Sequence, residues 1–522
     1  MTRSISLFQK KRQRRSLTGS QVKSGQISDC PPKPTFFEST CTVVKILSDL
    51  LSITARQATL HRGSGTRVLN TSVIRSMKRA LECEPIEVRT RRTIPVIGDS
   101  KVFVGRDLLS SIASELTPAN GIRASKFVIV SDANVWPLYG KTILAGFAAL
   151  PNMTIHDVAS SAAKAEANSQ AFSFADACGN CGDQPIGSND DGQLVLTYQI
   201  PSGEGSKCRA VKDEIEDFML AHRCNRDTCM IALGGGVVGD LVGFVAATFM
   251  RGVPFVQVPT SSTGMIDSSV GGKTAINVPA GKNLIGAFHQ PIAVYADMDC
   301  LATLGRRELV EGIAEAIKMG VIRMPSLFEL LERHPERVMA LDPELIEQVI
   351  YDSIRGKAEV VALDEKEGGL RSTLNWGHTI GHAVEALKSP EMMHGECVSV
   401  GCVAEAEVAM RLGRPDQQLD ASKIARITAC FASYGLPVHV PRGLPIEMLM
   451  KKMALDKKNR GTTIRCTVVT DIGISLEQPQ PCPKDIMEAV MAESMAEGLK
   501  HPEWVPHKGN HGVAAAGGQM AK

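Results

Sequence analysis

Aromatic residues are scarce in this 522-residue chain, and no single sign of charge dominates it. Only 4% of the residues are Phe, Trp or Tyr, and 58 Lys and Arg face 56 Asp and Glu, for a formal net charge of +2. This balance argues against a protein that binds nucleic acid along its whole length. The 43% hydrophobic and 22% charged residues argue against a mostly disordered chain.

Long uninterrupted apolar runs are also missing. The most apolar window, 230–250, contains Asp240 and five glycines, so we expect a buried strand, turn and helix there and no membrane partner. The 14 cysteines include one closely spaced pair, Cys178 and Cys181, with no second pair at zinc-finger spacing. We interpret this pair as part of a surface loop. Because no secretory signal is visible, we expect a cytoplasmic protein.

The first 93 residues differ from the rest of the chain. Five basic residues fall between Lys10 and Arg15, and Asp29 is the only acid before Glu38. This composition is typical of an organelle-targeting leader or of a disordered extension. Both interpretations stay open, so organelle targeting is the alternative to a cytoplasmic location.

From Ile94 onward the pattern is that of an α/β protein followed by a helical half. We predict a domain over 94–300 with a loop insertion at about 159–193, a helical domain over 301–496 and a loose tail over 497–522. Buried strands are predicted at 126–131, 230–233 and 255–258. Helices are predicted at 306–322, 343–363, 377–387, 396–412 and 421–434.

A glycine-rich turn, 234–240, follows the second of these strands and opens a helical pattern. Gly234, Gly236 and Gly239 fit the spacing G-x-G-x-x-G, which lets backbone N–H groups approach a phosphate at a helix N-terminus. The motif alone is weak, and the alternative is a tight turn that packs a helix on a sheet. Asp132 and Asn134, after the first predicted strand, fall where α/β sheets bind ligands.

Two further polar loops carry lysines beside glycines. The loop 201–207 places Glu204 and Lys207 together, and the loop 267–277 carries Lys273, followed by Lys282. The second loop is not a P-loop, since Gly-x4-Gly-Lys-Ser/Thr is absent. We interpret it as a polar loop whose composition suits a phosphate.

Three histidines lie within 17 residues of one another. His378 and His382 are four residues apart on a predicted helix and share a face, and His394 begins the next helical segment. The predicted helix 306–322 offers Glu308, Glu311 and Glu315. Two histidines and one carboxylate with an open position are typical of a catalytic Zn²⁺ site. Spacing cannot choose which two histidines or which glutamate would bind.

Taken together, these segments resemble the 3-dehydroquinate synthases, members of the sugar-phosphate cyclase superfamily. The resemblance rests on GGGVVGD (234–240), DSSVGGKTAIN (267–277), GKNLIGAFHQP (281–291), GIAEAIK (312–318), LNWGHTIGHAVE (374–385) and HGE (394–396). It covers about 94–476. DEKEGGLR (364–371) and ALDKKNRG (454–461) look most like the fungal form, usually fused into a pentafunctional polypeptide. We expect a stand-alone version.

The resemblance implies a Rossmann-like α/β N-terminal domain and an all-α C-terminal domain, with the active site in the cleft between them. It implies Zn²⁺, with Co²⁺ as an alternative, on Glu315, His378 and His394. It also implies NAD and a homodimer, in which Arg251 reaches the neighbouring subunit's site. The implied NAD contacts are Asp132, Asn134, Glu204, Lys207, Gly235, Gly236, Val237, Asp240, Thr260, Ser261, Asp267, Ser268, Lys282 and Thr303. The implied substrate contacts and proton movers are Asp267, Lys273, Asn283, Lys357, Arg371, Asn375, His382 and Lys457.

The family reaction converts 3-deoxy-D-arabino-heptulosonate 7-phosphate to 3-dehydroquinate and phosphate in the shikimate pathway. It proceeds through transient NAD-dependent oxidation, phosphate elimination, re-reduction and internal aldol closure, so it is a phosphorus–oxygen lyase reaction. Three alternatives stay open: a sibling cyclase that makes valiolone-type rings, a metal-dependent polyol dehydrogenase, and a non-catalytic relative. Retention of Gly271, Gly272 and Lys273 favours the synthase over the sibling.

Overall fold

The computed structural model describes residues 91–117, 120, 122–157, 193–454 and 463–506. The predictions for the basic extension, the 159–193 insertion with Cys178 and Cys181, the end of the tail and Lys457 lie outside these residues, apart from the few positions at their edges.

An eight-stranded sheet forms the centre of the first half, in the order β1-β2-β10-β7-β6-β3-β5-β4. Only β1 and β2 pair antiparallel, and all other neighbours are parallel. The strands are β1 (Arg92–Pro95), β2 (Lys101–Gly105), β3 (Lys126–Asp132), β4 (Met153–His156), β5 (Gln193–Ile200), β6 (Cys229–Gly234), β7 (Phe255–Pro259) and β10 (Ala293–Asp297). The three strands predicted from sequence correspond to β3, β6 and β7 and are confirmed.

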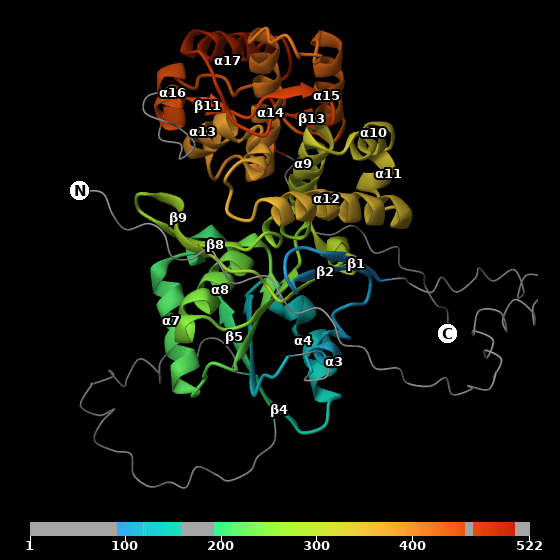
Figure 1. Ribbon diagram of the computed structural model, residues 1–522, viewed down its shortest axis with the longest axis vertical. Helices are drawn as coiled ribbons and strands as arrows, with labels where there is room; N and C mark the ends of the chain where they lie inside the picture. Colours follow the sequence, from blue (N-terminus) through green and yellow to red (C-terminus); the bar gives the residue numbers. More distant parts are fainter. Residues whose placement is uncertain (1–90, 118–119, 121, 158–192, 455–462, 507–522) are drawn as a thin grey trace, which may run out of the picture. The chain divides into compact units, whose positions relative to one another are not determined.

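Strand β3 explains why these runs are apolar without alternation. Phe127 and Ile129 face one hydrophobic core, and Val128 and Val130 face another. A parallel sheet covered on both faces requires this pattern. The first core also contains α3 (Ile112–Glu115) and α4 (Trp136–Ala148), and the second contains α7 (Arg209–Ala221) and α8 (Gly236–Thr248). In Figure 1, α7 and α8 lie together in green beside the sheet.

The second half is mainly helical, as predicted. Its helices are α9 (Arg306–Ile322), α10 (Pro325–Arg333), α11 (Pro335–Met339), α12 (Pro343–Leu363), α13 (His378–Lys388), α14 (His394–Arg411), α15 (Ala421–Ser433), α16 (Ile446–Ala454) and α17 (Lys484–Gly498). The prediction of an all-α domain missed four short strands. They form the pairs β11 (Arg465–Cys466) with β14 (Gln480–Pro481), and β12 (Val469–Asp471) with β13 (Ile474–Ser475).

Helix α12 shows why a predicted boundary was accurate. Pro343 is the first residue of the helix, and the Asp342 carboxylate accepts a hydrogen bond from the Leu345 N–H at 3.3 Å. Proline and an aspartate cap are the expected signals of a helix start. The predicted tail differs, because α17 continues to Gly498 and the Trp504 indole donates to the Gly435 carbonyl at 3.0 Å.

The loop predicted over 267–277 is mostly ordered secondary structure, so that interpretation was wrong. Residues Gly264–Ser268 form a short helical turn, η4, and Lys273–Val278 (β8) pairs antiparallel with Gly281–Phe288 (β9). The two lysines of this region therefore project from a hairpin. The hairpin packs on α8, where a Cβ on Gly243 would lie 2.5 Å from the Thr274 methyl.

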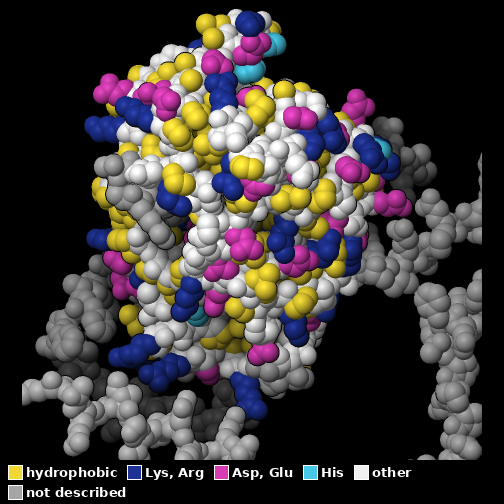
Figure 2. All heavy atoms as spheres, turned by 45° about the horizontal axis from the view of Figure 1, so that its top comes forward, with side chains coloured by type: hydrophobic (Ala, Val, Ile, Leu, Met, Phe, Trp, Pro, Cys, Tyr) yellow, Lys and Arg dark blue, Asp and Glu magenta, His cyan; other side chains and the backbone are white. Residues whose placement is uncertain are grey.

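The two halves share one hydrophobic core. Val102 and Ile129 of the sheet belong to the same cluster of buried residues as Ile317 of α9 and Val360 of α12. On the face that Figure 2 shows, basic and acidic side chains are interspersed. Among the described helices, none has the length and apolar character needed to span a bilayer.

Candidate active site

The predicted nucleotide residues gather at the carboxyl edge of the sheet. Strand β3 ends at Asp132 and β6 ends at Gly234, with Ser131 paired to Leu233 in neighbouring strands. After β3, the chain continues to β4 and β5 on one side of this pair, and after β6 it continues to β7 on the other side. A crevice at such a reversal is the usual ligand position in open α/β sheets.

The glycine-rich turn leads into α8 at this edge. Gly235 caps the helix, and Gly236 and Val237 are its first residues. A Cβ added at Gly236 would lie 2.9 Å from the Ser268 hydroxyl, and one at Gly235 would lie 3.2 Å from the Ser261 hydroxyl. The absence of side chains therefore allows a close approach of backbone to the loop after β7. The N-terminus of α8 is suited to hold an anion.

Lys207 and Asp240 form a buried ion pair beside this turn. The Lys207 ammonium lies 2.5 Å from Oδ2 of Asp240, and Lys207 is 4% exposed. Burial raises the pKa of Asp240, and the lysine charge opposes this shift. Nearby, the Asn277 amide donates to Glu204 at 2.7 Å, which joins the 201–207 loop to the β8–β9 hairpin.

Several other predicted nucleotide contacts also support the local fold. Oδ1 of Asp132 accepts hydrogen bonds from the backbone N–H groups of Asn134 and Val135, at 2.8 and 3.0 Å, at the start of α4. Thr260 is buried, and its N–H donates to the Gly234 carbonyl at 3.0 Å. The Thr303 hydroxyl contacts the Tyr139 hydroxyl.

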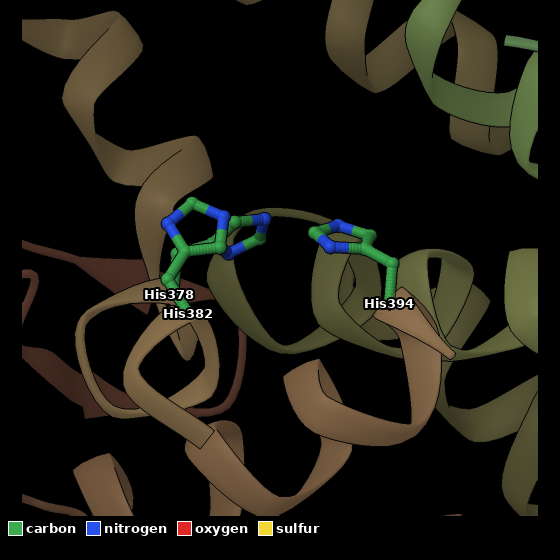
Figure 3. A group of neighbouring side chains, drawn as sticks. All are labelled: His378, His382 and His394. Carbon is green, nitrogen blue, oxygen red and sulfur yellow. The ribbon is translucent and has the colours of Figure 1, made fainter. Parts of the chain in front are cut away.

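The three histidines converge, as Figure 3 shows. One nitrogen from each ring lies within 4.8 Å of the others. His378 and His382 project from α13 with ring centroids 4.9 Å apart, and His394 comes from the start of α14. His378 is buried, His394 half-buried and His382 exposed.

Glu315 of α9 lies against two of these rings. Its Oε1 is 3.7 Å from Nε2 of His378 and 3.4 Å from Nε2 of His394. Two ligand atoms on a tetrahedral zinc at a bond length of about 2.1 Å lie about 3.4 Å apart. Glu315 is 2% exposed, and its Oε2 pairs with the Lys318 ammonium, while its Oε1 faces the two imidazoles. A buried carboxylate whose Oε1 faces two imidazole nitrogens fits a divalent metal.

In His378 and His394, the other ring nitrogen, Nδ1, already has a hydrogen-bond partner. Nδ1 of His378 lies 3.0 Å from the Trp376 carbonyl, and Nδ1 of His394 lies 3.0 Å from Oε2 of Glu385. Each contact places a proton on Nδ1, so Nε2 is the nitrogen of each ring that a metal would bind. Nε2 of both rings faces Oε1 of Glu315, so Glu315, His378 and His394 are placed to share a metal, and His382 lies close enough to join them.

The surroundings shift the pKa values of His378 and His394 in opposite directions. Burial, reinforced by the charge of Lys318, lowers the pKa of His378 well below its ordinary value. Burial also disfavours the charged form of His394, but Glu315 and Glu385 outweigh it and raise the pKa of His394 to about 10. Burial works against ionisation of Glu315, yet its ion pair with Lys318 and its contact with His394 hold the pKa of this carboxyl below its usual range.

The predicted substrate residues form a second group beside the metal cluster. Lys357 of α12 is 6% exposed, and its ammonium lies 2.7 Å from Oδ1 of Asp267 in η4. Burial raises the pKa of Asp267, but the Lys357 charge outweighs it and the net shift is downward. The Arg371 guanidinium is buried and donates to the Gly271 carbonyl at 2.8 Å. The backbone N–H of Asn283 donates to Asn277 at 3.1 Å.

Sequence reasoning missed Glu367. Its carboxylate lies 2.7 Å from the Lys273 ammonium and 2.7 Å from the Asn375 amide nitrogen, so it joins two predicted substrate residues. Its backbone φ is +61°, a conformation that most side chains avoid. The acidic run 364–367 was the only local signal.

The structure does not bring Arg251 to this site within one chain. Arg251 is exposed and follows the carboxyl end of α8, whereas Gly236 opens that helix. The 13 residues of α8 separate the two ends by about 20 Å.

Comparison with known proteins identifies the family. The model of the 3-dehydroquinate synthase N-terminal domain matches residues 197–311, and that of the C-terminal domain matches residues 312–459. Together the two matches span half of the chain. The pentafunctional AROM polypeptide of Schizosaccharomyces pombe is 41% identical over 411 residues, which is 74% of this chain and 24% of the relative. AROM polypeptide 1 of Lodderomyces elongisporus is 47% identical over 338 residues, which is 60% of this chain and 22% of the relative. The chain thus spans about a quarter of the length of these relatives.

Solved structures agree with the fold. 2-epi-5-epi-valiolone synthase from Streptomyces hygroscopicus, with NAD⁺ and Zn²⁺ bound, matches with a TM-score of 0.61 and 25% identity, over 76% of this chain and 96% of the other. A 2-deoxy-scyllo-inosose synthase, complexed with carbaglucose-6-phosphate, NAD⁺ and Co²⁺, matches with a TM-score of 0.63 and 21% identity, over 77% of this chain and 100% of the other. With both of its domain models matched in order, and with the Rossmann-like and helical halves expected of it, the chain belongs to the 3-dehydroquinate synthase family.

Proposed function

We propose that this chain catalyses the family reaction, the conversion of 3-deoxy-D-arabino-heptulosonate 7-phosphate to 3-dehydroquinate and phosphate. The observation that carries the proposal is the approach of Glu315 to Nε2 of both His378 and His394, at 3.7 and 3.4 Å. These three residues would hold Zn²⁺ or Co²⁺. When bound, the metal supplies a Lewis acid and NAD supplies a reversible hydride acceptor.

The position of the metal residues relative to the sheet supports the same reaction. The Gly312 N–H of α9, one turn before Glu315, lies 3.2 Å from the Ser262 hydroxyl. Ser262 follows Thr260 and Ser261 at the end of β7, where we place the nucleotide. The metal helix and the nucleotide edge of the sheet are therefore in direct contact, as hydride transfer next to a metal requires.

The chain's own side chains suit an anionic substrate. Lys273, Lys357 and Arg371 provide positive charge for a carboxylate and a phosphate. His382 is exposed beside His378, with ring centroids 4.9 Å apart, so it can exchange protons with substrate and water. Glu367, which bridges Lys273 and Asn375, is placed to orient both.

The test is phosphate release by the full chain given the heptulosonate phosphate, NAD⁺ and Zn²⁺. We expect release of phosphate without accumulation of NADH, because the hydride is returned. A chelator and His378→Ala should each abolish activity, whereas His156→Ala, an exposed histidine on the edge strand β4, should not. Net NADH production would instead identify a polyol dehydrogenase. Preference for a heptulose phosphate without the carboxylate would identify a sibling cyclase.

We also propose a cytoplasmic homodimer in which Arg251 acts in the neighbouring subunit's site. Apart from Cys466, the eight other cysteines of the described residues form no disulfide, and seven of them are buried, which suits a reducing compartment. Mixing an Arg251→Ala protein with a His378→Ala protein should restore activity, since one site of the mixed dimer has both residues. Light scattering that finds only monomers would contradict the dimer.

A further inference from the structure

His394 and His378 differ in what holds their second nitrogen. The acceptor at His378 is the Trp376 carbonyl, which the backbone fixes. The acceptor at His394 is the carboxylate of Glu385, a side chain of α13 that is 13% exposed. The geometry of His394 therefore depends on a rotatable group, whereas that of His378 does not.

A lysine from the other half of the molecule holds this carboxylate. Nζ of Lys282 lies 2.8 Å from Oε1 of Glu385, while Oε2 of the same carboxylate faces His394. Lys282 belongs to β9 of the hairpin, and Glu385 belongs to the helix that carries His378 and His382. The contacts Lys282–Glu385–His394–Glu315 form one continuous chain from the hairpin to the candidate metal position.

From these contacts we propose that Glu385 is a positioning residue for His394 and that Lys282, acting through Glu385, couples the β8–β9 hairpin to the metal site. The inference rests on the proposed function, because it assigns a role within the same site. A carboxylate that accepts the Nδ1–H bond fixes the ring orientation and makes Nε2 a stronger metal ligand. Lys282 limits the rotation of that carboxylate. The hairpin also reaches the nucleotide residues, since Asn277 of β8 donates to Glu204.

The test measures zinc affinity of the full-length protein by competition with a chromogenic chelator, with no substrate or NAD present. Glu385→Ala should weaken zinc binding 10–100-fold, the usual effect of removing such a partner. Glu385→Gln should lose less, because the amide oxygen still accepts the Nδ1–H bond. The matched control is Glu391→Ala, whose carboxylate is 73% exposed and pairs with Lys388; it should bind zinc like the wild type.

Lys282 is tested in two backgrounds. Lys282→Ala should weaken zinc binding by about threefold to tenfold in the wild type and should have no further effect in Glu385→Ala. The Co²⁺-substituted proteins should show a changed visible spectrum for both single variants, which a loss of stability alone would not produce. Retained helical circular dichroism establishes that each variant is folded.

Zinc affinity of Glu385→Ala within twofold of the wild type would overturn the positioning role. An equal loss for Lys282→Ala in both backgrounds would overturn the coupling. A wild type that binds zinc normally yet releases no phosphate would refute the proposed function, and the affinities would still decide the role of Glu385. A wild type that binds no zinc would refute both.

Discussion

Arg307 fixes the start of the helix that carries His394, and its removal gives a quantitative test of the structure. Its guanidinium donates to both oxygens of Glu396 in α14, at 2.6 and 2.8 Å, and to the Glu391 carbonyl at 2.7 Å. The Glu396 side chain is 5% exposed and also accepts the Met393 N–H at 2.8 Å. Arg307→Ala would leave this buried carboxylate with one donor.

Loss of one partner of a buried pair typically costs 3–5 kcal/mol. Arg307 is 24% exposed, so water can replace part of the lost contact, and we expect a loss of about 2–3 kcal/mol. Urea unfolding of the full chain, followed by helical circular dichroism, measures this directly. The control is Arg333→Ala, whose i,i+4 pair with Glu329 has both side chains about half exposed or more; it should cost less than about 0.5 kcal/mol. Equal costs for the two variants would refute the assignment of a buried bidentate pair.

Two further predictions concern stability. Gly401→Ala should destabilise the protein by about 3 kcal/mol in urea unfolding, because the new Cβ would meet the Gly377 carbonyl oxygen at 1.9 Å; helix propensity alone predicts a gain of about 1 kcal/mol. Arg426 lowers the pKa of Glu332 through a bidentate contact at 2.9 and 2.7 Å, so the wild type should be more stable than Glu332→Gln at neutral pH by less than about 1 kcal/mol. Because the folded-state pKa is depressed, this difference should be present above about pH 4.3, the pKa of an unfolded-state glutamate, and should vanish as the pH falls through the folded pKa. A difference that is independent of pH would contradict the ion pair.

Local patterns predicted the elements that depend on local signals. Buried runs predicted β3, β6 and β7, and the periodicity of apolar residues together with Asp342 and Pro343 predicted α12. The hairpin was missed because Lys273, Asn277 and Lys282 are not strand-forming residues and its turn contains Pro279, so composition suggested a loop. Strands β11 to β14 are two or three residues long and carry too little pattern to detect.

The metal cluster shows the limit of spacing arguments. Spacing within one helix placed His378 and His382 on the same face, but it did not decide which two histidines or which glutamate would bind. The structure instead brings His394 and Glu315 to His378 through the close packing of α13, α14 and α9, in which Gly401 lies against Gly377. Such a contact between distant segments leaves no trace in local periodicity. The resemblance to the family supplied Glu315, His378 and His394, whose side chains the structure brings together.

The common core of the two halves has a consequence for engineering. Helix α12 packs on β1 and β2, and its Val360 shares a hydrophobic cluster with Val102. Expressing residues before and after position 300 as separate proteins would expose this cluster on both fragments, so we expect each fragment to aggregate. A chimera that takes its helical half from a relative must therefore also take the matching faces of β1, β2 and β10.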